Sequence, residues 1–143
     1  MAHTDTGLAA LERTVQKTHE WIKDIENILE CDPHYAFQSL RAVLHILRDR
    51  LPLATAIHLG DQLPMLIRGL YYENWTPTHE PRHKERSAED FLDRLNGYFP
   101  KEAALDSEGI VRGVFQVLRA HVTEGEIHAV RAVLPAPISS LWE

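Results

Sequence analysis

Hydrophobic residues recur along this chain at intervals of three and four, the spacing of an amphipathic helix. The first such pattern runs through Leu8, Leu11, Val15, Trp21, Ile22, Ile25, Ile28 and Leu29. Similar patterns predict helices near residues 33–51, 52–63, 65–72, 87–99, 107–122 and 124–134, and a short helix at the end of the chain. We find no convincing strand pattern. The sequence therefore predicts an all-α protein.

Residues with helix-capping side chains precede four of these patterns. They are Asp32 before Pro33, Ser87 with Asp90, Asp106, and Thr123 with Glu126. Such side chains accept hydrogen bonds from the free N–H groups of a first helical turn. The inner face of the second helix is expected to hold Phe37, Leu40, Val43, Leu44, Leu47 and Leu51. Pro64 and Pro135 interrupt two of the patterns, so we expect helix breaks there.

The helical pattern occurs twice. Adding 71 to residues 40–71 places them on residues 111–142 without a gap. The identical pairs are Arg41/Arg112, Val43/Val114, Leu47/Leu118, Arg48/Arg119, Leu63/Leu134, Pro64/Pro135, Ile67/Ile138 and Leu70/Leu141. We interpret residues 1–143 as a single domain, an internally duplicated helical bundle with a pseudo-twofold relation. Its two units, about 8–73 and 87–143, have three to four helices each and are joined by a polar linker at about 74–86.

Three stretches resemble a known family. They are "LRAVLHILRDRL", "LPMLIRGLYYENWTP" and "GEIHAVRAVLP". Together they are similar to an uncharacterised bacterial family, domain of unknown function 2267 (DUF2267), from about Val15 to Trp142. The resemblance implies an all-helical, duplicated, cytoplasmic protein. It implies no established activity and no catalytic residues.

Composition narrows the class of protein further. The net charge is −6, and both halves of the chain are acidic, so a nucleic-acid partner is not expected. No apolar run approaches the roughly 18 residues of a membrane span. The N-terminal residues lack the layout of a secretory signal. The single cysteine, Cys31, excludes an intrachain disulfide. We therefore expect a cytoplasmic location.

Few residues form a pattern with catalytic or metal-binding chemistry. The nine histidines are scattered and show no zinc-ligand spacing, so we predict no metal and no cofactor. The nucleophile and phosphate-loop motifs are missing as well. An enzyme is the least favoured class.

Two sets of residues are candidate sites. Arg41, Arg48, Arg112 and Arg119 border the apolar faces at matched positions in the two units. They either pair with internal carboxylates or bind an anion or an acidic partner. The second set is aromatic: Tyr71, Tyr72, Trp75 and Trp142. These side chains either close the core of each unit or form an exposed protein-contact patch.

The preferred function is a non-enzymatic helical interaction or scaffold module that contacts another protein or itself. The alternative is a small-anion or ligand-binding protein that uses the duplicated arginines. A thermal-shift screen separates the two, because a ligand that binds only the folded form raises the melting temperature.

Overall fold

The computed structural model describes residues 6–143, and these residues form helices and contain no strand. The first half consists of α1 (Thr6–Leu29), α2 (Pro33–Arg50), α3 (Leu53–Asp61) and α4 (Met65–Tyr72). The second half consists of α5 (Ala88–Asp93), the 3-10 helix η1 (Arg94–Tyr98), α6 (Ser107–His121), α7 (Glu124–Ala132), α8 (Ala136–Ser139) and the 3-10 helix η2 (Ser140–Trp142). The prediction of an all-α protein is confirmed.

The capping residues begin the helices that the sequence predicted. The Asp32 carboxylate accepts from the Tyr35 N–H, with Pro33 in the first turn of α2. Ser87, Asp106 and Thr123 likewise accept from the N–H three residues on, at the starts of α5, α6 and α7. These contacts satisfy donors that a helix cannot satisfy internally.

Both predicted proline breaks are present. Pro64 separates α3 from α4, and Pro135 separates α7 from α8, each with a φ of −58°. The offset of 71 relates the bounds of several helices. Residues 53–61 of α3 correspond to residues 124–132 of α7, and the last residues of α2 and α6, Arg50 and His121, also correspond.

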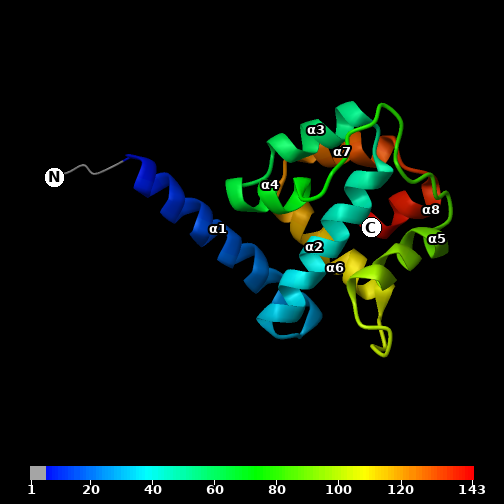
Figure 1. The fold of residues 1–143 in the computed structure, drawn as a ribbon, viewed down its shortest axis with the longest axis horizontal. Helices are drawn as coiled ribbons and strands as arrows, with labels where there is room; N and C mark the ends of the chain where they lie inside the picture. Colours follow the sequence, from blue (N-terminus) through cyan, green and yellow to red (C-terminus); the bar gives the residue numbers. More distant parts are fainter. Residues whose placement is uncertain (1–5) are drawn as a thin grey trace.

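Helix α2 lies at the centre of the fold and contacts α1, α4, α6 and η1 (Figure 1). Because it has neighbours on several sides, it is buried around most of its circumference. The predicted core positions Val43, Leu47, Val114 and Leu118 are each fully buried. This α2–α6 core is the support on which the polar residues described below are held.

Two expectations were wrong. Phe37 was expected on the inner face of α2, but it is 39% exposed, because it lies in the first turns of the helix, where fewer neighbours cover it. The helix expected over residues 87–99 is shorter. It becomes the 3-10 helix η1 at Arg94, and Phe99 has extended backbone beyond it.

Residues 73–87, which include the segment predicted as a linker at about 74–86, contain no helix. They nevertheless make backbone contacts with the helical body. The His83 N–H donates to the Asp49 carbonyl at 3.0 Å, and the Arg50 guanidinium donates to the Glu85 carbonyl at 2.7 Å. The segment therefore crosses the C-terminal end of α2 and forms part of the surface there.

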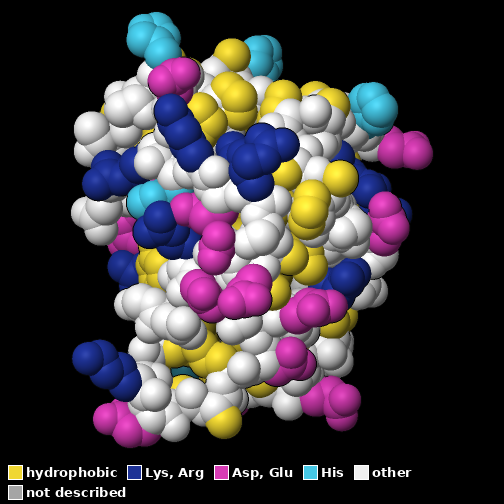
Figure 2. Space-filling view, turned by 90° about the vertical axis from the view of Figure 1, so that its right-hand side faces the viewer, with side chains coloured by type: hydrophobic (Ala, Val, Ile, Leu, Met, Phe, Trp, Pro, Cys, Tyr) yellow, Lys and Arg dark blue, Asp and Glu magenta, His cyan; other side chains and the backbone are white. Residues whose placement is uncertain are grey.

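The face that carries α5 and α8 has a mixed surface. Acidic and basic side chains are interspersed over it, with apolar side chains showing between them (Figure 2). Such a mixture is typical of protein surfaces in contact with solvent.

Candidate functional site

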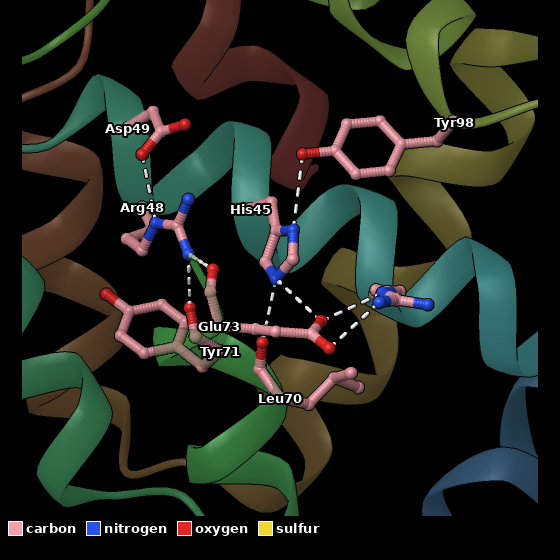
Figure 3. Close-up of polar contacts among 8 residues, drawn as sticks. His45, Arg48, Asp49, Leu70, Tyr71, Glu73 and Tyr98 are labelled. Atoms are coloured by element: carbon pink, nitrogen blue, oxygen red, sulfur yellow. Dashed lines mark hydrogen bonds and ion pairs between the residues drawn. The ribbon is translucent and has the colours of Figure 1, made fainter. Parts of the chain in front are cut away.

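Arg48 makes the most extensive contacts of the four candidate arginines. Its side chain is 4% exposed, and its Nε donates to the Asp49 carboxylate at 2.9 Å. Its Nη1 donates to the carbonyls of Tyr71 and Glu73, at 2.8 Å each (Figure 3). These carbonyls lie at the C-terminal end of α4, where a helix has no internal donors to offer them. Arg48 therefore caps α4 from the side.

Arg119 makes the corresponding contact in the second half. Its Nη1 donates to the Trp142 carbonyl at 2.7 Å, and the offset of 71 maps Arg48 onto Arg119 and Tyr71 onto Trp142. The contact that the two arginines share is thus a bond to a helix-end carbonyl. Among the described residues, an internal carboxylate partner, which the sequence suggested for these arginines, is present for Arg48 but not for Arg119. A cation at this end also interacts favourably with the helix dipole.

The outer pair of arginines is bound to carboxylates. Arg41 forms a bidentate ion pair with Glu73, with distances of 2.9 and 2.8 Å. Arg112 pairs with Glu108 one helical turn away at 2.8 Å, and also donates to the Glu143 carbonyl at 3.1 Å. The Arg112–Glu108 pair is the more exposed of the two and contributes little stability, whereas the Arg41–Glu73 pair is half-buried and bidentate. Whether any of the four arginines binds an external anion stays a prediction.

The aromatic candidates separate into two buried and two half-buried side chains. Tyr71 and Trp142 are buried, and Trp142 stacks on Phe115 with ring centroids 3.8 Å apart. The Tyr71 hydroxyl donates to the Ala56 carbonyl at 2.7 Å, and burial raises the pKa of this phenol. Tyr72 and Trp75 are half-buried and stack on each other at 5.2 Å. Tyr71 and Trp142 therefore pack in the core of the protein, and only the other two contribute to the surface.

His45 was not among the candidates, although it lies at the centre of a polar cluster. The residue is 3% exposed, and both of its ring nitrogens have partners (Figure 3). Its Nε2 lies 2.7 Å from the Leu70 carbonyl, and its Nδ1 lies 3.2 Å from the Tyr98 hydroxyl. A carbonyl only accepts, so Nε2 carries the proton and Nδ1 accepts from the tyrosine.

The surroundings of His45 favour its neutral form. Burial lowers its pKa by removing the charged imidazolium from water, and the nearby Arg48 guanidinium lowers it further. The Leu70 carbonyl and the Glu73 carboxylate act in the opposite direction but do not outweigh burial. Burial also raises the pKa of Tyr98. The His45–Tyr98 contact is thus a hydrogen bond between two neutral groups that joins α2 to η1.

A hollow of about 430 Å³ lies over this cluster. We call it the polar hollow, and it is lined by Gln38, Arg41, His45, Arg48, Asp49, Glu73, Asn74, Arg82, His83, Gly97 and Tyr98. Asn74 has a φ of 57°, a left-handed backbone conformation that asparagine tolerates better than most residues. One feature of the sequence pointed to this site. Under the offset of 71 the arginines match, but the polar residues around them do not, and Gln116 stands at the position that corresponds to His45.

The histidine and acidic side chains that line the hollow are not arranged as a metal centre. The described residues include no group of three or more histidine, cysteine or acidic side chains arranged to hold a metal ion. Cys31 is unpaired and half-buried, and burial raises the pKa of its thiol.

A second, apolar surface lies on α1 and α4. Leu8, Leu11 and Val15 on α1 are 56, 51 and 44% exposed, and Met65 and Leu66 on α4 are 54 and 48% exposed. We call these five residues the α1–α4 surface. The two helices are joined at Thr14, whose hydroxyl accepts from the Leu66 N–H at 3.1 Å. Thr14 lies within one turn of Leu11 and Val15, so the start of α4 is placed beside the exposed part of α1.

The structure thus defines an all-helical protein with a polar hollow and an exposed apolar surface. Residues 18–141 match the model of the family described as "Uncharacterized conserved protein (DUF2267)", and the chain belongs to this family. None of the curated proteins shows significant sequence similarity to the chain. Within residues 6–143, every helix is too short or too polar to cross a membrane.

Proposed function

We propose that the protein is a helical interaction module that associates with a second copy of itself through the α1–α4 surface. The observation that carries this proposal is the exposure of five large apolar side chains on two adjoining helices. Exposed apolar side chains that cluster in this way mark sites of protein contact, whereas single ones are ordinary.

The spacing along α1 supports a helical partner. Leu8, Leu11, Val15, Thr18, Ile22, Ile25 and Leu29 follow one another at alternating intervals of three and four. This is the heptad spacing of helices that pack along their length. Ile25 in the C-terminal half of α1 is fully buried within the body of its own chain. The N-terminal half projects away from the body, so its part of the seam lacks a helix to pack on (Figure 1).

The charge of α1 favours a second copy of the chain as the source of the missing partner helix. Residues 8–20 of α1, which include the exposed part of the seam, carry Glu12 and Glu20 against Arg13 and Lys17, so this stretch is electrically neutral although the whole chain has a charge of −6. Two such segments can therefore meet without net repulsion between them. A twofold dimer also needs only one self-complementary surface, and it is the commonest arrangement among soluble oligomers.

The oligomeric state in solution tests this proposal. We expect wild-type protein to sediment as a dimer and Leu11→Glu to sediment as a monomer, because the substitution places a carboxylate in the centre of the apolar seam. Gln16→Glu is the matched control, since it adds the same charge at an exposed position of the same helix. A monomeric wild-type protein at every concentration would overturn the proposal, as would equal effects of the two substitutions.

We also propose that α2–α4 and α6–η2 are copies of one unit related by a pseudo-twofold axis. The contacts between helices support this arrangement: α2 packs on its counterpart α6, and α3 packs on its counterpart α7. A detail of the helix ends supports it too. In the first half Arg68 donates to the Gly60 carbonyl, and in the second half Arg131, at the position of Gly60, donates to Ser139, at the position of Arg68. In each half an arginine thus joins the two short helices on either side of the proline break. Arg68 reaches back from the second of these helices, and Arg131 reaches forward from the first.

The geometry gives less support to anion binding by the four repeated arginines, because each already donates to carbonyls or carboxylates of its own chain. We further propose that the module acts in the cytoplasm, since its one cysteine is unpaired.

A further inference from the structure

We infer that the polar hollow is a binding site for a small oxyanion, a carboxylate or phosphate group, with Arg82 as its anchor. The site is separate from the α1–α4 surface and does not depend on self-association.

The walls of the hollow are held in place before any ligand arrives. On one side Tyr98 is bound twice, since its hydroxyl contacts His45 and its carbonyl accepts from Gln38 at 2.7 Å. On the other side Arg41 holds the Glu73 carboxylate and Arg48 holds the Glu73 carbonyl. A site whose groups are already fixed loses less conformational entropy when it binds.

The charges in the hollow do not cancel. Its lining contains the guanidinium groups of Arg41, Arg48 and Arg82 but only two carboxylates, Asp49 and Glu73. These two carboxylates are paired with Arg48 and Arg41. Arg82 is exposed at the rim of the hollow, and within residues 6–143 its side chain has neither an ion pair nor a hydrogen bond. His45 is neutral as described above. One positive charge is thus in excess, and an anion that enters the hollow would balance it.

The chemistry of Arg82 indicates which anion this is. A guanidinium offers a planar set of N–H donors that matches the oxygen atoms of a carboxylate or phosphate. The hollow has a volume within the usual range for small-molecule sites. The lining also includes Asn74, whose side-chain amide can donate to further oxygens of a ligand.

Comparison with the second half shows that the repeated unit does not need this cluster. Gln116 stands at the position of His45 and Ala120 at the position of Asp49, yet α6 forms as α2 does. The polar side chains that close the hollow are therefore additions to the first half, and packing of the helical unit does not account for them.

Isothermal titration with acetate and with inorganic phosphate tests the inference, and the two titrations show which oxyanion is preferred. We expect the wild-type chain to bind at least one of them. Arg82→Ala should weaken that binding by about tenfold or more, equivalent to about 1.4 kcal/mol. Arg86→Ala is the matched control, because it removes the same charge from an exposed residue of the same segment that does not line the hollow. Its affinity should stay close to that of the wild type.

Nuclear magnetic resonance places the ligand. We expect titration to shift the ring signals of His45 and Tyr98 in the wild-type protein and in Arg86→Ala, but not in Arg82→Ala at the same anion concentration. Equal weakening by the two arginine substitutions would show general charge attraction and overturn the inference. Absence of binding by the wild type to both anions would overturn it as well. Absence of anion binding would not affect the sedimentation test of self-association, since the two experiments concern different surfaces of the protein.

Discussion

The same arginine–carbonyl contact occurs once in each half of the molecule, in very different surroundings. Arg48 is 4% exposed and binds two carbonyls and the Asp49 carboxylate. Arg119 is exposed, and its guanidinium contacts one described partner, the Trp142 carbonyl. The contact common to both is the one that fixes the last helix of each half against its central helix. The additional contacts of Arg48 belong to the polar hollow.

This difference separates the apolar positions that pack the helices from the polar positions that line the hollow. Apolar positions such as Leu47 and Leu118 are fully buried in both halves. Polar positions diverge: His45 is buried among hydrogen-bond partners, whereas Gln116 at the matching position is exposed. We expect substitutions at the apolar positions to act equally in the two halves, and substitutions at the polar positions to act unequally.

The largest effects are expected in the shared core. Leu47→Ala and Leu118→Ala should each lower the free energy of unfolding by about 2–5 kcal/mol, because each leaves a cavity among buried side chains. Chemical denaturation measures both values. A loss below about 1 kcal/mol for either leucine, the scale of surface substitutions, would show that the two halves do not share one core.

The helices that form this core could be predicted from the sequence because the signals that begin and end them are local. Caps such as Asp32 and Thr123 and breaks such as Pro64 act within a few residues, so they mark helix ends before the helices are packed. The exposure of an apolar side chain cannot be predicted in this way, because it depends on which other elements pack against it. Leu11 has the same place in its heptad as Ile25, and Leu11 is exposed only because the body of the protein does not reach it.

The polar hollow was harder to predict for the same reason. The α2 side chains that bond to Glu73 and Tyr98 lie between 25 and 60 residues away from them in the sequence, and Arg82 is similarly distant from the α2 residues of the hollow. Spacing along the sequence contains no sign of this proximity, which arises when residues 73–98 cross the end of α2. The repeated arginines were found from their positions, but the partners that Arg48 and Arg119 share are backbone carbonyls, which every residue has and which no sequence pattern marks.

The next largest effect on stability is expected for Arg48 and Arg119, the two arginines that bind helix-end carbonyls. Arg48→Met should lower the free energy of unfolding by about 2–3 kcal/mol, because it leaves two helix-end carbonyls and the largely buried Asp49 carboxylate without their donor. Arg119→Met should cost less than about 1 kcal/mol, since water can replace an exposed guanidinium. Urea denaturation of both variants checks the difference. Equal losses of unfolding free energy would mean that burial of the guanidinium does not change the contribution of the arginine–carbonyl contact.

The smallest effect is a pH dependence that buried His45 of the first half should contribute. Burial lowers the pKa of folded His45 from its ordinary value of 6.5, so below that value the unfolded chain binds a proton that the folded chain does not. Stability contributed by neutral His45 is therefore lost as the pH falls from about 7 toward the folded pKa, by at most about 1.4 kcal/mol per pH unit. His45→Gln, which introduces the residue of the second half, should remove this slope from thermal melts between about pH 7 and 5. The control His128→Gln, at an exposed position of α7, should keep it. If the wild-type and His45→Gln slopes coincide, His45 protonates as readily in the folded chain as in the unfolded one, and the buried Leu70 and Tyr98 contacts do not hold it neutral.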